Sequence, residues 1–297
     1  MAEPEPSGRY RVGAPQPVGD PTSLLVRLHG RARGAPVLLG LDVPIGLPAD
    51  YARRAGVDDF IGLLPRLGRG RWGDFYTVRS TPDDISLTRP FYPMRPGGTR
   101  QRHLLDGLGV QDMSHLLRRC DAATADRGAA SPLFWTLGGK QVGKAAIVAW
   151  RDLIAPGLID DELAVSIWPF DGRLHALVSE GGIVIAETYP AEACLHLGLR
   201  PPGRGWSKRT REGRLAQKDR IERWAERRLV TFDGALHHRL ADGFGPSTHA
   251  DDPFDAMLGL LSMIEVATGH RPPGAPDTRE VRTVEGWILG QAARDHR

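Results

Sequence analysis

The stretch VLLGLDVPIGLP, residues 37–48, decides the fold class of this chain. Its first five residues, Val37–Leu41, form an uninterrupted apolar run, which is typical of a strand that is buried on both faces. Two prolines and a glycine follow between residues 44 and 48 and predict a turn directly after the strand. Asp42 is therefore expected at the carboxyl end of a buried strand, where parallel sheets tend to bind their ligands.

Helical and strand patterns alternate along the rest of the chain, which favours an α/β fold. Apolar periodicity predicts helices at residues 21–28, 104–126, 143–154, 190–197, 210–228 and 252–268. Short apolar runs separated by glycine-containing turns predict hairpin strands at residues 163–169, 174–178 and 183–188. We predict a single domain over residues 1–297, with an irregular N-terminus at 1–20, a long loop and helical insertion at 66–150, and a C-terminal extension at 270–297.

Composition indicates a globular protein of a reducing compartment. Hydrophobic residues make up 41% of the 297 residues and charged residues 25%, which are ordinary globular values. Cys120 and Cys194 lie far apart and in no ligand spacing, so neither a disulfide framework nor a structural zinc site is expected. The start lacks a secretory pattern, and the best apolar run, residues 256–267, is short and contains Glu265. We therefore expect a soluble, cytoplasmic protein without a membrane partner.

Carboxylates stand at three places where a site would need them. Asp42 follows the first buried strand, Glu187 ends another apolar run, and Asp252 and Asp255 share one face at the start of the last predicted helix. Buried strands rarely hold a charge without a partner or a metal, and carboxylate oxygens suit Mg²⁺ or Mn²⁺. Plainer interpretations stay open: a turn-forming Asp42, an ion-paired Glu187 and a helix-capping Asp252.

A basic segment covers residues 204–228, where ten Lys and Arg face four Asp and Glu, a local net charge of +6. Such a segment could bind the phosphates of a nucleic acid. The residues that would contact phosphate are Lys208, Arg209, Arg211 and Arg214. A solvated, salt-bridged helix is the alternative interpretation.

Two further signals are weaker. Residues 138–145, GGKQVGKA, nearly match a P-loop, but Ala145 stands where the loop needs a hydroxyl for Mg²⁺. A nucleotide enzyme that uses this loop is therefore a minor alternative. His249, just upstream of the acidic helix start, could be a general base or a ligand, although a surface histidine is the simpler interpretation.

Taken together, these segments resemble a known family. Five segments occur in the same order as in the domain-of-unknown-function family numbered four-two-nine, which is predicted to contain RNase H-like nucleases. The family's "IDxPxGLP", "ExYPE", lysine- and arginine-bearing, "DDxxDA" and "EGWI" segments resemble residues 41–48, 186–192, 208–214 with Arg220, 251–256 and 284–290. The D-x-x-D-A start of the last helix is also similar to that of Holliday-junction resolvases.

The resemblance implies an RNase H-like mixed sheet flanked by helices, and a metal-dependent nuclease or phosphodiesterase that uses Mg²⁺ or Mn²⁺. The implied metal ligands are Asp42, Glu187, Asp252 and Asp255. Members of the family usually begin with a strand that carries an acidic residue, and no such strand precedes Asp42 here. We expect either that this strand lies upstream of Met1, or that the protein is an inactive RNase H-like relative that binds nucleic acid or a partner protein.

Overall fold

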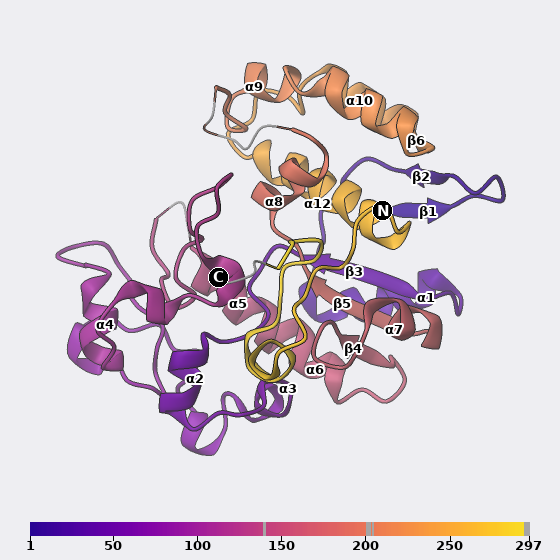
Figure 1. Ribbon diagram of the computed structural model, residues 1–297. Coiled ribbons are helices and arrows are strands. Elements are labelled where there is room, and N and C mark those ends of the chain that lie inside the picture. The colour runs from indigo at the N-terminus through magenta and orange to yellow at the C-terminus, as the bar shows by residue number, and fades with distance from the viewer. Residues whose placement is uncertain (139–140, 200–202, 204, 294–297) are drawn as a thin grey trace. The chain divides into compact units, whose positions relative to one another are not determined.

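The computed structural model describes residues 1–138, 141–199, 203 and 205–293. The chain divides into two compact units. Unit 1 consists of Met1–Val18 and Thr188–Pro273, and unit 2 of Gly19–Glu187 and Gly274–Arg297. Each unit combines a small sheet with helices (Figure 1), so the predicted α/β class is confirmed.

The sheet of unit 2 is parallel throughout. Its strands are β3 (Val37–Leu41), β4 (Val165–Ile167) and β5 (Ile183–Glu187), in the order β3-β5-β4. All residues of the central strand β5 are buried, whereas β3 lies at an edge and is only partly buried, unlike the strand covered on both faces that its sequence predicts. Leu41 at the end of β3 pairs with Glu187 at the end of β5, so the carboxyl ends of the two strands are aligned.

The hairpin predicted between residues 163 and 188 is wrong. The middle segment is the helix α7 (Leu174–Glu180), which follows β4 and precedes β5 in the chain. The two strands pair with each other in parallel. Leu174 and Leu177, three residues apart, are the buried residues of α7, so the short apolar run has helical spacing. The Asp171 carboxylate accepts a hydrogen bond of 2.6 Å from the Ile167 amide and closes the turn between β4 and α7.

The remaining helices of unit 2 are short. Residues 104–126 are α-helical only at their start, because α4 ends at Leu108 and Gly109 takes a left-handed conformation with φ of 67°. Two short 3₁₀ helices follow, at Met113–Leu116 and Arg119–Asp121. Residues 143–154 are helical as predicted, with a π-helical turn after α5. The helices and π-helical turns are α1 (Leu24–Ala32), α2 (Ala49–Ala55), α3 (Phe60–Leu63), α4 (Arg102–Leu108), α5 (Val142–Val148), the turn Ala149–Ile154, α6 (Ala155–Leu158) and the turn Val281–Glu285.

The predicted insertion at residues 66–150 supplies much of the core of unit 2. Phe75 packs edge to face on Phe91, and Phe91 packs in the same way on Phe134. Phe75 also stacks on Trp150, which is fully buried. This long excursion is therefore held by an aromatic cluster, which explains how a segment with little regular structure keeps a defined path.

The sheet of unit 1 includes the N-terminus. Its strands are β1 (Ala2–Pro4), β2 (Tyr10–Val12) and β6 (Val230–Phe232), in the order β1-β2-β6. Strand β2 pairs antiparallel with β1 and parallel with β6. The prediction that residues 1–20 are irregular is therefore wrong for these strands, and the fully buried Val12 explains why β2 is ordered.

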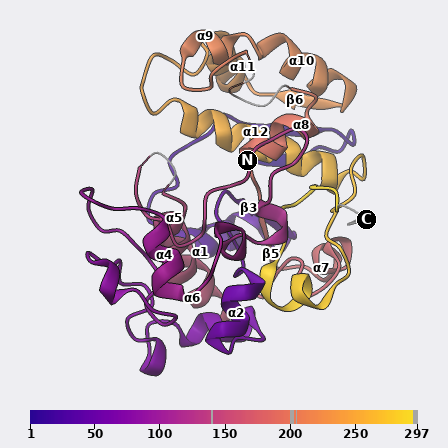
Figure 2. The same cartoon turned by 60° about the vertical axis from the view of Figure 1, so that its left-hand side comes forward.

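Helix α12 (Asp251–Ala267) runs through the core of unit 1, with α8 (Pro190–His196) packed against it. The helix predicted at residues 210–228 is divided into α9 (Arg211–Leu215) and α10 (Lys218–Arg227), and α11 (Gly234–Ala241) contacts α9. Figures 1 and 2 both show α9 and α10 side by side on one side of α12. In the described part of the chain, no helix is long and apolar enough to cross a membrane.

Candidate functional site

Two of the predicted ligands lie at neighbouring strand ends in unit 2. Glu187 is the last residue of β5, and Asp42 is the first residue after β3. Because Leu41 pairs with Glu187 in the parallel register, Asp42 lies one residue beyond the partner of Glu187. Asp42 is exposed and Glu187 is buried, so the two carboxylates have different surroundings although they share one edge of the sheet.

Both oxygens of Glu187 are bound by one arginine. Arg118 donates from Nη1 to Oε2 and from Nη2 to Oε1, each at 2.6 Å, and the Ile45 amide donates to Oε2 at 2.8 Å. Burial raises the pKa of Glu187, and the charge of Arg118 opposes that shift. Glu187 is thus ion-paired, which is one of the interpretations that its sequence allowed. It could bind a metal only by displacing Arg118 from this pair.

Arg118 was not among the residues that the sequence indicated. Its side chain is fully buried, and each of its N–H groups has an acceptor. Nε and Nη2 donate to the two oxygens of Asp121, each at 2.9 Å, and Nη1 also donates to the Glu285 carbonyl at 3.3 Å. One guanidinium therefore joins the 118–121 turn, the end of β5 and the terminal segment of unit 2.

The loop that follows Asp42 is fixed by hydrogen bonds from several segments. Glu187 accepts from the Ile45 amide, Trp150 Nε1 donates to the Pro44 carbonyl at 2.8 Å, and the Leu47 amide donates to a carbonyl of the π-helical turn at 2.8 Å. The segments at residues 41–48, at Glu187 and at residues 284–288 thus meet in unit 2. Their meeting places the backbone after Asp42 in one defined path.

Glu285, in the same terminal segment, is buried and only partly satisfied. Its Oε1 accepts from the Ala49 amide at 3.3 Å, whereas its Oε2 is buried without a hydrogen-bond partner. Burial raises the pKa of this carboxyl. The surroundings of Arg118 therefore hold more acidic than basic groups.

The other two predicted ligands lie in unit 1, at the start of α12. Asp251, Asp252 and Asp255 occupy its first two turns, and Asp252 is exposed whereas the Asp255 side chain is only 14% exposed. The N-cap residue is Ala250, and no side chain caps the helix. Asp252 is therefore not the N-cap that the plainer interpretation supposed, although its charge suits the helix dipole.

Asp255 is bound on one oxygen and unpaired on the other. Its Oδ2 accepts a hydrogen bond from Lys208 Nζ in a close ion pair, and its Oδ1 is buried without a partner. Burial raises the pKa of Asp255 to about 6, against the effect of Lys208, and the charges of Asp251 and Asp252 raise it further.

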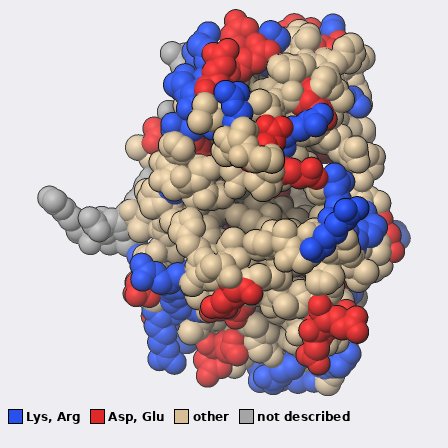
Figure 3. All heavy atoms as spheres, turned by 90° about the vertical axis from the view of Figure 1, so that its right-hand side faces the viewer, with Lys and Arg blue, Asp and Glu red and all other residues tan. Residues whose placement is uncertain are grey.

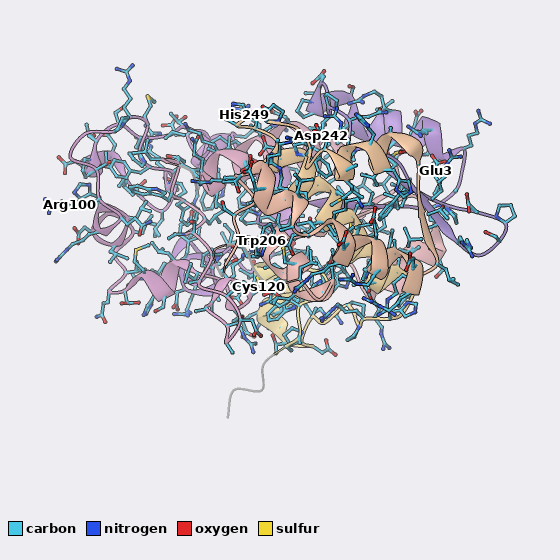
Figure 4. The ribbon with its side chains drawn as sticks, turned by 90° about the horizontal axis from the view of Figure 1, so that it is seen from above. Glu3, Arg100, Cys120, Trp206, Asp242 and His249 are labelled. Atoms are coloured by element: carbon cyan, nitrogen blue, oxygen red, sulfur yellow. The ribbon has the colours of Figure 1, made fainter. Side chains whose placement is uncertain are left out.

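Aromatic side chains hold the surroundings of Asp255 in place. Phe254, the preceding residue, is fully buried and packs edge to face against Trp206 and Phe244. Trp206, labelled in Figure 4, belongs to the same segment as Lys208. Burial raises the pKa of the Cys194 thiol to about 12, and the nearby charge of Asp255 adds to the shift. Asp255 therefore stands in a largely apolar environment, which strengthens its interaction with any cation.

The predicted phosphate contacts have different roles in the structure. Arg214 is buried and donates to three carbonyls, those of Lys208, Gly243 and Gly245, at 2.6 to 2.8 Å. Arg211 pairs with Asp242, whose position is labelled in Figure 4. Arg214 is therefore an anchor for the backbone of Lys208, a role that the sequence pattern did not reveal.

The basic segment as a whole is mixed in charge. Lys218 pairs with Glu222 at 2.9 Å, and Arg228 pairs with Glu265 at 2.7 Å. Arg209 is exposed, and Arg204 lies outside the described residues. In Figure 3, basic and acidic side chains interleave over the upper part of the view, which is the side of unit 1 that carries α10 in Figure 1. Lys208, Arg211, Lys218 and Arg228 have acidic partners, so ion pairs offset part of the +6 charge of the segment.

The P-loop-like stretch and His249, the two weaker signals of the sequence, can also be located in the structure. Residues 139 and 140 of the P-loop-like stretch lie outside the described residues, and Lys144 is exposed on α5. Gly143 is packed so closely that an added Cβ would lie 2.8 Å from the Leu133 carbonyl oxygen, which explains a glycine there by packing. His249 is exposed, and its carbonyl accepts from the Asp252 amide at the start of α12.

Within the described ranges, no three His, Cys, Asp or Glu side chains are gathered so that they could hold a metal ion. Comparison of the chain with protein-family models, with curated proteins and with solved structures finds no match. The function is therefore argued from the geometry of the residues themselves.

Proposed function

We propose that this protein is a divalent-metal-dependent phosphodiesterase or nuclease of RNase H-like fold, with Asp252 and Asp255 at the start of α12 as ligands of Mg²⁺ or Mn²⁺. The observation that carries the proposal is the buried, unpaired Oδ1 of Asp255. An acceptor in such a place destabilises the fold by about 1–3 kcal/mol. Uncompensated groups of this kind concentrate at functional sites.

In the proposal, a hard cation is held by few protein ligands. Asp255 offers a carboxylate oxygen that has no protein partner, and Asp251 and Asp252 add negative charge in the same two turns. Mg²⁺ commonly keeps several waters and binds through one or two carboxylates together with substrate phosphates. Such a site does not require three gathered protein ligands. When bound, the cation would supply a more acidic water and neutralise phosphate charge.

Unit 2 supports the RNase H-like part of the proposal. Its parallel sheet is covered by helices, and Asp42 and Glu187 stand at adjacent strand ends. In the proposal, Glu187 positions the loop after Asp42 through its bond to the Ile45 amide. Arg118 would hold Glu187 in that role.

Two basic residues remain as phosphate contacts in the proposal. Lys208 lies at the acidic site itself, and Arg209 is exposed next to it. Arg211 could reach a phosphate only after leaving Asp242, and the buried side chain of Arg214 donates to three backbone carbonyls. In the proposal, nucleic acid therefore binds near Lys208. The rest of residues 204–228 holds this binding site in place.

Calorimetry of Mn²⁺ binding tests the proposal. The wild type should bind Mn²⁺, and Asp255→Asn should weaken binding by about tenfold or more, because it removes the charge of a ligand. Asp252→Asn tests the second proposed ligand at the start of α12. Glu226→Gln is the matched control, since it removes an exposed carboxylate of unit 1 away from the start of α12.

Hydrolysis of bis(p-nitrophenyl) phosphate and of short oligonucleotides, with and without Mn²⁺, is the second measurement. Activity should require the metal and disappear in Asp255→Asn, while circular dichroism shows an unchanged fold. A wild type that binds no Mn²⁺, or an Asp255→Asn variant that binds it unchanged, would overturn the proposal. The non-enzymatic alternative, a nucleic-acid or protein binding module, would then be the one to pursue.

A further inference from the structure

We propose that unit 2 carries a binding surface for single-stranded nucleic acid, formed by the loop at residues 93–103 together with α5 and Trp135. In the proposal, four exposed basic side chains contact phosphates, and the partly exposed Trp135 contacts a base. The basic side chains are those of Arg95, Arg100, Arg102 and Lys144. The inference goes beyond the proposed function, because it concerns a different unit and requires neither a metal ion nor hydrolysis.

Two segments that are remote in the sequence lie side by side at this surface. Tyr92, directly before the loop, pairs with Trp135 in a parallel bridge. Thr136 donates from its amide to the Tyr92 carbonyl at 3.1 Å, and from its hydroxyl to the Pro93 carbonyl at 2.7 Å. The Gly143 amide in α5 donates to the Trp135 carbonyl at 3.0 Å. The loop and α5 are therefore both attached to the short backbone segment around Trp135.

Both segments carry positive charge that no acidic residue within them balances. The sequence has no Asp or Glu at residues 85–105 or at residues 127–151. The three arginines of the loop and Lys144 are exposed, and none of the four has an ion-pair partner in the part of the chain that the structure describes. Their charge is therefore available to an external anion, in contrast to that of the basic segment of unit 1.

The loop is held at both ends, so its arginines stay at one place. Pro93 is buried at its start, and Leu104, directly after its end, is fully buried. The Tyr92 hydroxyl and His103 Nδ1 form a hydrogen bond of 2.9 Å between the two ends. Compact surface loops whose ends meet are frequently functional. Figure 4 shows Arg100 at the outer edge of unit 2, where a ligand has access to it.

The residue types favour a single-stranded nucleic acid over other anions. Arginine forms paired hydrogen bonds with phosphate oxygens, and three of the four basic residues are arginines. The Trp135 ring meets the Tyr92 ring edge to face, with centroids 6.2 Å apart, and so places an aromatic side chain beside the loop. Proteins that bind single strands combine basic groups with aromatic rings on which bases stack. An anionic membrane would attract the arginines but would not require the aromatic ring.

Fluorescence anisotropy of a labelled oligothymidylate of about 16 nucleotides, with a chelator present, tests the proposal. The wild type should bind it, with an affinity that falls as KCl rises from about 50 to 200 mM. A triple variant, Arg95→Gln with Arg100→Gln and Arg102→Gln, should bind about tenfold more weakly. It should also reduce the slope of log affinity against log salt by about 2, because each phosphate contact on a single strand contributes about 0.7. Lys144→Gln alone should reduce that slope by about 0.7.

A matched control separates this surface from general charge effects. Arg33→Gln with Arg173→Gln and Arg279→Gln removes three exposed arginines of unit 2 that lie in other segments. This triple variant should change the affinity less than about twofold and keep the salt slope. Circular dichroism of both triple variants checks that the fold is unchanged.

Trp135→Leu tests the contact with a base. It should weaken binding of the oligothymidylate about fivefold or more, because it removes a stacking ring. Binding of inorganic polyphosphate, which has no bases, should stay as in the wild type when it is measured by calorimetry. A Trp135→Leu variant that binds the oligothymidylate like the wild type would overturn the assignment to nucleic acid.

The outcomes separate this proposal from the proposed function. A wild type that does not bind the oligothymidylate, or an arginine triple variant of the loop that binds it like the wild type, overturns the surface in unit 2. Neither result bears on the metal site, because the chelator removes the metal. A loss of binding in Arg209→Gln without a loss in the loop variant would assign the nucleic acid to unit 1 alone. Binding to phosphatidylserine vesicles but not to the oligothymidylate would make this a membrane surface and would also overturn the proposal. If the wild type binds no Mn²⁺ but the loop arginines are required for the oligothymidylate, the proposed function fails and the surface stands.

Discussion

The backbones of Gly46 and Gly286 cross so closely that neither position has room for a side chain. A Cβ on Gly46 would lie 2.1 Å from the carbonyl oxygen of Glu285, and one on Gly286 would lie 2.2 Å from that of Ile45. Both glycines have positive φ, of 139° and 65°. This crossing joins the loop after Asp42 to the terminal segment of unit 2, so it is a structural reason for glycine in both segments.

Gly46→Ala should destabilise the protein by about 2–5 kcal/mol, because it combines backbone strain with a clash against a carbonyl. Urea unfolding followed by tryptophan fluorescence measures the loss. Gly30→Ala is the control: Gly30 lies in α1 with nothing within 4 Å of an added Cβ, and its substitution should stabilise by about 0.5–1 kcal/mol. Equal effects of the two substitutions would contradict the crossing.

Arg118→Met should be among the most destabilising single substitutions in unit 2. It would leave Asp121 and Glu187 buried without their cation, a change that typically costs about 3–5 kcal/mol. Arg53→Met breaks an exposed ion pair with Asp50 and should cost less than about 1 kcal/mol. Denaturant midpoints of both variants measure the loss of stability. Similar losses in Arg118→Met and Arg53→Met would show that the Arg118 network contributes little to the stability of the fold.

Strong local patterns were predictable from the sequence. Val37–Leu41 and Ile183–Glu187 are strands because short continuous apolar runs suit a parallel sheet. Asp251–Ala267 is a helix because its apolar stripe repeats at helical spacing over many turns. The acidic residues followed from these elements, since each was predicted at an element end and lies there.

Contacts between distant segments were not predictable. Arg118 meets Glu187 across 69 positions and the Glu285 carbonyl across 167, and no local pattern encodes such pairings. Leu174–Glu180 was misassigned because a short apolar run fits a strand and a helix equally well. The sequence showed only that the segment at residues 204–228 is basic. The structure distinguishes Arg214, which binds carbonyls, from exposed residues such as Arg209.

His196 should make unit 1 sensitive to acid. Burial, helped by the charge of Arg271, lowers the pKa of His196 to about 3, and its Nδ1 lies 2.6 Å from Ser262 Oγ. A lowered histidine pKa means that stability is complete above about pH 6.5 and is lost as the pH falls toward 3, because the unfolded chain takes up the proton first.

In the wild type, the free energy of unfolding should fall between about pH 7 and pH 4.5, because the unfolded chain takes up a proton on His196. His196→Asn should therefore make this fall less steep, by up to the slope that the uptake of one proton produces. His238→Asn, at an exposed position on α11, is the control and should leave the slope as it is. Urea unfolding at several pH values gives the slopes. A wild-type slope that persists in His196→Asn would mean that other groups cause the acid sensitivity.

Asp255→Asn should stabilise the metal-free protein while it removes metal binding. Burial raises the pKa of Asp255 to about 6 from 3.8, so the folded state prefers the protonated form. The unfolded chain loses that proton first as the pH rises from 3.8 to 6, and the folded state is then at a disadvantage that persists above pH 6. The asparagine variant does not have this disadvantage, so its gain in the free energy of unfolding should approach about 3 kcal/mol near pH 8 and vanish near pH 4.

Thermal or urea unfolding at both pH values, in the presence of a chelator, measures the gain, and Glu226→Gln should show none. A loss of stability at pH 8 would mean that the pair with Lys208 stabilises the fold more than burial of Asp255 destabilises it, which would make this carboxylate a structural residue.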